Sequence, residues 1–153
     1  MLEICDLFLA DATRSKNLKF LKLLDKHFIY EKGKEYSGYV GICVNRIRLI
    51  PQIHLLREEG IRSYSVPINY KNSVQISKEE AFAIAAKDID ETQGYLVMDD
   101  AFLPNNIPLV WLFSFINQNK EIIGGKVIVD RIDGHIWTAD EYDKYMYDYN
   151  NIF

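Results

Sequence analysis

The sequence predicts an α+β fold in which an antiparallel sheet packs against helices. Two helix-start signals, at residues 77–80 and 138–141, each place a Glu three positions after a Ser or Thr. Between them lie runs rich in β-branched and aromatic residues, at 94–100, 109–117 and 125–131. The links between several of these runs are short and polar, which favours antiparallel neighbours over crossover connections.

Further strands and helices are predicted in the N-terminal half. Residues 3–10 predict a strand or a short buried helix, because periodicity does not distinguish the two. Residues 15–29 predict an amphipathic helix with lysines away from its apolar face. Residues 39–50 predict a strand, and a short helix from Pro51 to Gly60 and an edge strand over 61–68 follow it. The apolar face of the first helix consists of Leu18, Leu21, Leu24 and Phe28.

The C-terminal half predicts a helix, a series of strands and a last helix. The helix that begins at Ser77 extends to about residue 89, and its small alanines allow close packing on a sheet. Residues 104–108, with two prolines, predict a rigid loop, and Asp133-Gly134 predicts a hairpin turn. A short strand at 135–137 precedes the C-terminal helix.

The chain length fits one domain, here residues 1–153, since domains typically contain about 100–150 residues. Residues 69–76 are the most polar link in the chain. If there are two subdomains, we expect them to meet there. The N-terminal subdomain would then contain residues 1–75, and a helix-plus-sheet subdomain would contain residues 76–153.

Cysteine usage and the apolar pattern predict a cytoplasmic protein. Cys5 and Cys43 are too far apart for a CxxC motif, and we expect both to be buried, reduced thiols. The N-terminal segment has no basic region, and Asp6 and Asp11 interrupt its apolar stretch, so it does not read as a signal peptide. No apolar run approaches the roughly 20 residues that cross a bilayer, and we expect no membrane partner.

The net charge of −4 conceals an asymmetry. Residues 1–76 carry 12 Lys and Arg against 8 Asp and Glu, whereas residues 77–153 carry 6 against 14. The basic residues do not form the dense stripe of a nucleic-acid-binding protein, so we expect no direct contact with nucleic acid. The acidic half indicates either a basic partner or solubility alone.

Motifs for catalysis, metals and cofactors are missing from the sequence. The three histidines are far apart, and there is no zinc spacing, nucleophile elbow, P-loop or dinucleotide fingerprint. We therefore expect no catalytic residue, no metal and no cofactor. One carboxylate set leaves two alternatives open. It could bind a divalent cation or act in acid–base chemistry, or it could form ordinary hydrogen bonds within turns. It consists of Asp99, Asp100, Asp130 and Asp133.

The C-terminal segment interleaves acidic and aromatic residues. Tyr142, Tyr145 and Tyr149 recur at helical spacing, which is typical of a core stripe with a solvated acidic face. The same composition is also typical of a binding surface for a basic partner. The candidate binding residues are Asp130, Asp133, Trp137, Asp140, Glu141, Tyr142, Asp143, Tyr147 and Asp148.

Short motifs over about half the chain resemble those of two families. The first is the PepSY-like module, a helix on a small antiparallel sheet with a cystatin-like architecture. The second comprises the small immunity proteins of bacterial polymorphic-toxin and contact-dependent inhibition systems. The motifs are Ile76-Ser77-Lys78-Glu79-Glu80-Ala81 with Ala85, Trp111-Leu112-Phe113, Gly125-Lys126-Val127-Ile128-Val129-Asp130 and Asp133-Gly134-His135-Ile136.

The resemblance to immunity proteins implies a small cytoplasmic protein without catalytic residues. Such a protein binds its cognate toxin domain and occludes the active site, and an acidic half would suit a basic nuclease toxin. PepSY modules usually belong to exported or membrane proteins, so the sequence favours the immunity role. The resemblance is also compatible with a second function, that of an inhibitory or ligand-binding PepSY-like module. The carboxylate set is compatible with a third, that of an enzyme.

Overall fold

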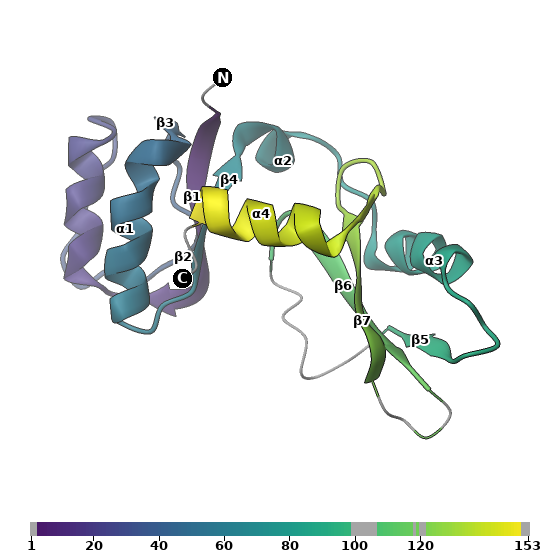
Figure 1. Ribbon diagram of the computed structural model, residues 1–153. Helices are drawn as coiled ribbons and strands as arrows, with labels where there is room; N and C mark the ends of the chain where they lie inside the picture. Colours follow the sequence, from purple (N-terminus) through teal and green to yellow (C-terminus); the bar gives the residue numbers. More distant parts are fainter. Residues whose placement is uncertain (1–2, 99–106, 118, 120–121, 151–153) are drawn as a thin grey trace. The chain divides into compact units, whose positions relative to one another are not determined.

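The computed structural model describes residues 3–98, 107–117, 119 and 122–150, which form an α+β fold with two antiparallel sheets (Figure 1). The chain divides into two compact units. Unit 1 contains Met1–Asn72 and Asp143–Phe153, and unit 2 contains Ser73–Tyr142. The predicted fold class is confirmed.

Unit 1 is built around its first strand, β1, which has a partner along each edge. Cys5 pairs with Pro67 of β4 and with Val44 of β3, so β3 and β4 occupy opposite edges of β1. β2 pairs with β1 farther along, beside β3. The elements of this unit, apart from the end of α4, are β1 (Ile4–Thr13), η1 (Lys16–Leu23), β2 (Tyr36–Tyr39), β3 (Val44–Asn45), α1 (Arg46–Glu58), β4 (Ser63–Pro67) and α2 (Ile68–Asn72).

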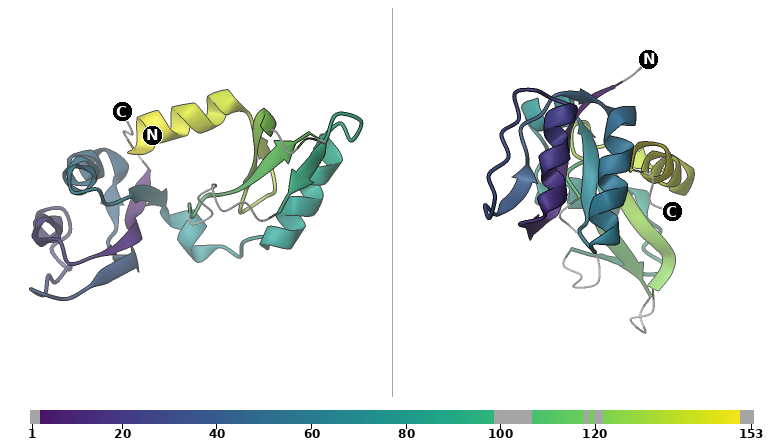
Figure 2. Two further views of the ribbon diagram at one scale, coloured as in Figure 1. Left: turned by 90° about the horizontal axis from the view of Figure 1, so that it is seen from below. Right: turned by 90° about the vertical axis from the view of Figure 1, so that its left-hand side faces the viewer.

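The core of unit 1 lies between this sheet and the pair formed by η1 and α1, which lie side by side (Figure 2). Alternate residues of β1, namely Cys5, Leu7 and Leu9, point to this face and are buried. The helices contribute a matching set of buried side chains: Leu18, Leu21, Leu49, Ile53 and Leu56.

The predicted helix over 15–29 is wrong in type and length, because η1 is a 3-10 helix that ends at Leu23. Its sequence repeats every three residues, which matches three residues per turn rather than 3.6. The leucine row is mostly buried, whereas the lysine row is exposed. The leucine row is Leu18, Leu21 and Leu24, and the lysine row is Lys16, Lys19 and Lys22.

The predicted strand over 39–50 is also wrong, because α1 begins within it. Asn45 caps α1 by accepting a hydrogen bond from the backbone N–H of Ile47 at 3.2 Å. Leu49, Ile53 and Leu56 then recur at helical spacing on the buried face, so packing overrides the strand preference of β-branched residues. Pro51 lies inside this helix and is exposed, although proline was expected at the first helical position.

A buried carboxylate explains why the chain leaves the edge of β1 between β2 and β3. Asp6 is fully buried and accepts hydrogen bonds from the backbone N–H groups of Leu7 at 2.7 Å, Gly41 at 3.1 Å and Ile42 at 3.0 Å. Lys71 of α2 completes the shell at 2.8 Å. These contacts hold the 40–43 loop against β1, together with a backbone hydrogen bond from the Val40 N–H to the Leu7 carbonyl at 3.0 Å.

Unit 2 contains a meander sheet in the order β5-β6-β7-β8, with α3 on one face (Figure 1). Its strands and helix follow the predicted order, and β7 begins three residues earlier than expected. The elements are α3 (Lys78–Asp88), β5 (Tyr95–Val97), β6 (Val110–Ile116), β7 (Ile122–Asp130) and β8 (Ile136–Trp137). The last helix, α4 (Ala139–Asn150), belongs to unit 2 up to Tyr142 and to unit 1 from Asp143.

The predicted start and packing of α3 are confirmed. The Ser77 hydroxyl accepts a hydrogen bond from the backbone N–H of Glu80 at 3.1 Å. Ala81 and Ala85 are fully buried, and their small side chains let the helix lie close to the sheet. Their cluster includes Phe113 and Val129 of the central strands.

Candidate protein-binding surface

A groove of about 530 Å³ opens on unit 2 beside the end of α3. We call it the α3-end groove. Apolar side chains from the sheet and the helix end line it together with two carboxylates and one lysine. The lining residues are Asp88, Ile89, Asp90, Phe115, Lys126, Val127, Ile136, Trp137 and Thr138.

The α3-end groove exists because α3 stops before it covers the whole face of the sheet. Trp111, Phe113 and Phe115 alternate along β6 and share the face on which α3 packs. Phe113 is fully buried in the cluster that contains the α3 alanines, whereas Phe115 remains half-buried. Since α3 ends at Asp88, an apolar strip stays open to solvent beyond it.

The end of α3 gives the groove a negative side. The last carbonyl groups of a helix carry a partial negative charge, and the exposed Asp88 lies at this end. Asp90 follows, and hydrogen bonds from the hydroxyl and the backbone N–H of Thr92 hold the pKa of its carboxyl below the ordinary value. A cationic or hydrogen-bond-donating group is therefore favoured next to the apolar strip.

Trp137 and Tyr142 form the aromatic border of the groove. Trp137 lines it directly, and its ring centroid lies 6.5 Å from that of Tyr142. The Lys126 ammonium lies 5.8 Å from the centre of the Tyr142 ring. Large aromatic side chains with one polar atom are the residues most often found at binding hot spots.

The turn between β7 and β8 positions Trp137 through Asp130. The Asp130 carboxylate accepts from the backbone N–H of Ile132 at 2.8 Å and from Trp137 Nε1 at 3.0 Å. Gly134 closes the turn at φ +75°, and a Cβ there would lie 2.7 Å from Ile84 Cδ1. The turn therefore fixes the Asp130 carboxylate, and this carboxylate fixes the Trp137 indole.

The start of α4 orders the residues next to this border. Thr138 Oγ1 accepts from the backbone N–H of Glu141, and Glu141 Oε1 accepts from that of Thr138, both at 3.1 Å. This confirms the second predicted capping box. The Thr138 N–H also holds the pKa of the Glu141 carboxyl below its ordinary value, and His135 Nε2 lies 3.1 Å from that carboxylate.

The predicted binding residues lie in different environments. Asp130 is only 7% exposed, so we assign its carboxylate to the turn and not to a surface. Asp133 is exposed and accepts from the backbone N–H of His135 at 2.8 Å. Asp140, Glu141 and Asp143 are exposed, and Trp137 and Tyr142 are partly buried.

Several predicted positions fall outside what the structure describes. Asp99 and Asp100 lie outside the described residues, as do the side chains of Tyr147 and Asp148. The carboxylate set is therefore described only at Asp130 and Asp133, where both groups make turn hydrogen bonds.

The tyrosine stripe of α4 is described at two of its three positions. Tyr145 is buried, and its hydroxyl donates to the Ser65 carbonyl at 2.7 Å. Tyr142 is partly buried beside Trp137, and the side chain of Tyr149 lies outside the described residues. Tyr145 is therefore buried in unit 1, as the stripe predicts.

Sequence reasoning missed much of the α3-end groove. Asp88, Ile89 and Asp90 follow a predicted helix, and an isoleucine between two aspartates at a helix end is a signal that was available. Phe115, Lys126 and Val127 carry no such signal, since their exposure depends on where α3 ends over the sheet. The residues that could not be predicted are therefore those whose exposure depends on tertiary packing.

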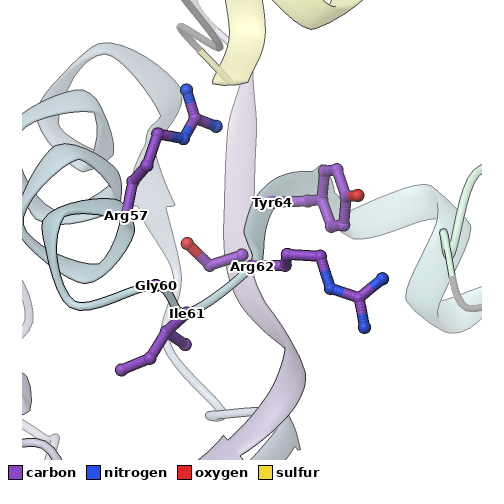
Figure 3. A pocket seen from close by; sticks show the side chains of 6 residues that line it. Arg57, Gly60, Ile61, Arg62 and Tyr64 are labelled. Carbon is purple, nitrogen blue, oxygen red and sulfur yellow. The ribbon is translucent and has the colours of Figure 1, made fainter.

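A second hollow, of about 300 Å³, lies in unit 1 (Figure 3). Arg57 and Arg62 line it and extend in different directions. The Asp11 carboxylate already binds the Arg62 guanidinium at 2.8 and 3.1 Å, and this contact holds the pKa of Asp11 below its ordinary value. Burial raises the pKa of Tyr64, which also lines the hollow. The two guanidinium groups therefore do not converge on one anion.

The two thiols are free and lie in different surroundings. Cys5 is buried, and burial is the main cause that raises its pKa to about 12. Cys43 is exposed, so the expectation that both thiols are buried is wrong for this residue. It lies in the loop between β2 and β3, where its backbone N–H donates to Asp25 at 3.1 Å.

Metal-binding clusters and membrane-spanning helices are both absent from the described residues. Within residues 3–98, 107–117, 119 and 122–150, no three or more His, Cys, Asp or Glu side chains are grouped so as to hold a metal ion. Among the same residues, no helix is both long enough and apolar enough to cross a bilayer.

Comparison with known proteins found no matching family model, no matching curated protein and no matching solved structure. The resemblance to immunity proteins and PepSY-like modules therefore rests on the short sequence motifs.

Proposed function

We propose that this chain is an immunity-type protein that binds a cognate bacterial toxin domain and occludes its active site. The observation that supports this proposal is the α3-end groove, an apolar strip between exposed carboxylates and the Trp137–Tyr142 border. Unit 2 carries 12 Asp and Glu against 5 Lys and Arg, which favours a basic partner.

The groove suits one long side chain of the partner that combines an apolar stem with a positive end. The stem would cover Phe115, Val127 and Ile136, and the charge would lie near Asp88 and Asp90. Full burial of one large apolar side chain contributes about 1.5–3 kcal/mol. An arginine or lysine on the toxin domain meets this description, because both have long apolar stems.

The acidic surface and the aromatic border would act on different steps of binding. Exposed carboxylates attract a basic partner at long range and raise the association rate. Contacts with Trp137 and Tyr142 form only after docking and lower the dissociation rate. Tight binding over the toxin's active site would then exclude its substrate.

The first test is co-purification with the C-terminal domain encoded by the gene directly upstream. We expect a stable complex in size-exclusion chromatography and loss of that domain's toxicity when both are expressed together. If the two proteins elute separately and toxicity persists, the immunity function is contradicted for that domain.

A second experiment tests the groove within the complex. We expect the double variant Asp88→Asn and Asp90→Asn to lower the association rate at low salt, because each substitution removes one negative charge while its amide oxygen still accepts hydrogen bonds. Surface plasmon resonance at low and high salt gives this rate. The matched control Glu31→Gln and Glu35→Gln removes two exposed carboxylates from unit 1 and should leave the rate nearly unchanged. Equal effects of the two pairs would contradict a docking role for the groove.

The arrangement of unit 2, with α3 on one face of an antiparallel meander, favours a PepSY-like inhibitory or ligand-binding module as a second candidate. Its target would occupy the same groove. This candidate gains support if the neighbouring gene does not encode a toxin and no complex forms.

A further inference from the structure

We infer that η1 docks unit 1 onto a membrane surface that contains anionic phospholipids. Because a 3-10 helix has three residues per turn, residues three apart in the sequence lie in a straight row along the helix. One row of η1 is buried, and the other two rows present lysines and apolar side chains side by side to solvent. This surface lies in unit 1, so it is independent of the function proposed for unit 2.

The first exposed row consists of Lys16, Lys19 and Lys22. Among the residues that the structure describes, no ion pair joins these three ammonium groups to a carboxylate. Arg48 of α1 contacts the same helix, because its Nη2 donates to the Leu23 carbonyl at 3.3 Å. Residues 14–34 together carry seven Lys and Arg against two Asp and Glu.

The second exposed row contains Phe20 and Leu23. Leu23 is 77% exposed and Phe20 is 39% exposed, although side chains of this size are usually buried. The Lys19 ammonium lies 5.1 Å from the centre of the Phe20 ring, so charge and apolar surface are adjacent. Exposed apolar side chains next to cations are the composition of helices that lie in the membrane interface.

The chemistry of these rows favours lipid over nucleic acid. Leu23 has no π face on which a base could stack, whereas the acyl boundary of a bilayer takes up an aliphatic side chain. The charged row contains lysine only, and lysine acts as a hydrated point charge that suits mobile headgroups. From the sequence we expected no membrane partner because no segment spans a bilayer, but docking in the interface requires no spanning helix.

The test is co-sedimentation of the full chain with vesicles. We expect binding to phosphatidylcholine vesicles that contain phosphatidylglycerol, weak binding to phosphatidylcholine alone, and loss of binding at high salt. The triple variant Lys16→Gln, Lys19→Gln and Lys22→Gln should lower the partition coefficient about a hundredfold, because each lysine adds electrostatic attraction to the anionic leaflet. Leu23→Gln should lower it about tenfold through lost apolar contact.

Matched controls separate this surface from general charge and exposure. Lys32→Gln with Lys34→Gln should lower binding less than Lys19→Gln with Lys22→Gln, which removes the same number of charges. Val74→Gln changes a residue that is 94% exposed outside η1 and should leave binding unchanged. The proposal is overturned if anionic vesicles do not sediment the protein or if the triple variant binds like the parent. Binding of a single-stranded oligonucleotide without binding to vesicles would also overturn it.

Discussion

At the scale of single residues, Asp6 is a fully buried carboxylate of unit 1 whose hydrogen bonds reach three parts of the chain. Its buried carboxylate is satisfied by three backbone N–H groups and by Lys71. A buried charge requires such a shell because an unsatisfied one costs several kcal/mol. One side chain thereby connects β1, the 40–43 loop and α2.

We expect Lys71→Met to lower the free energy of unfolding by about 2 kcal/mol, the usual value of a hydrogen bond to a charged group. The effect is smaller than for a fully buried pair, because the Lys71 side chain is about one third exposed and water can partly replace it. Urea unfolding followed by circular dichroism measures the change. Lys32→Met, at an exposed loop position, is the control and should have almost no effect. Equal stabilities of the two variants would show that the Asp6–Lys71 contact contributes nothing.

At the scale of elements, η1 shows how the period of a sequence selects the type of helix. Its three-residue repeat places all three leucines of one row toward α1 and β1, as three residues per turn require. An α-helix would rotate this row away from the core by successive turns. The same repeat produces the exposed lysine and apolar rows.

Two leucines of η1 offer a matched test of this geometry. Leu21 is fully buried and Leu23 is mostly exposed, although they lie only two residues apart. We expect Leu21→Ala to lower the free energy of unfolding by about 3 kcal/mol, the typical result of removing a buried leucine. Leu23→Ala should change it by less than about 0.5 kcal/mol. Denaturant titration compares the variants, and a similar loss for both would contradict the period-three packing.

At the scale of the whole molecule, charge is divided between the two units. Unit 1 carries 13 Lys and Arg against 10 Asp and Glu, whereas unit 2 carries 5 against 12. The two proposed surfaces follow this division, with anionic lipid expected at unit 1 and a basic protein at unit 2. We expect substitutions in one surface to leave binding at the other unchanged.

Carboxyl groups in both units predict how stability depends on pH. Hydrogen bonds hold the pKa of four carboxyls below the ordinary values of 3.8 for Asp and 4.5 for Glu, namely Asp11, Asp25, Asp90 and Glu141. A carboxyl whose pKa is lower in the folded state binds protons more weakly there, so it stabilises the fold above its ordinary pKa and loses this effect as pH falls. We therefore expect Tm to fall as pH decreases from neutral through about 4 and below. Calorimetry at several pH values measures this, and a constant Tm would contradict it.

The sequence determined the features that depend on neighbours within a few residues. The N-caps at Ser77 and Thr138 could be predicted because each capping hydrogen bond joins residues three apart and needs no distant partner. The return bond from the Glu side chain to the backbone N–H of the cap residue forms at Thr138, whereas the Glu80 carboxylate accepts from the Ser77 hydroxyl instead. The strands of unit 2 could be predicted from their runs of β-branched and aromatic residues, and the turn at Gly134 from its Asp-Gly pair, because both signals are local. The α+β class follows from these elements.

Only the tertiary structure decided the features that depend on distant contacts. The stretch over 39–50 reads as a strand, but Leu49 and its helical neighbours pack on β1 and make its second half a helix. The acidic cluster predicted near Asp130 is divided, since the Asp130 carboxylate is buried in a turn. The α3-end groove arises where α3 stops over the sheet, and its residues come from four separate segments of the chain. Local patterns cannot specify such a site, because the burial of each side chain is set by elements far away in the sequence.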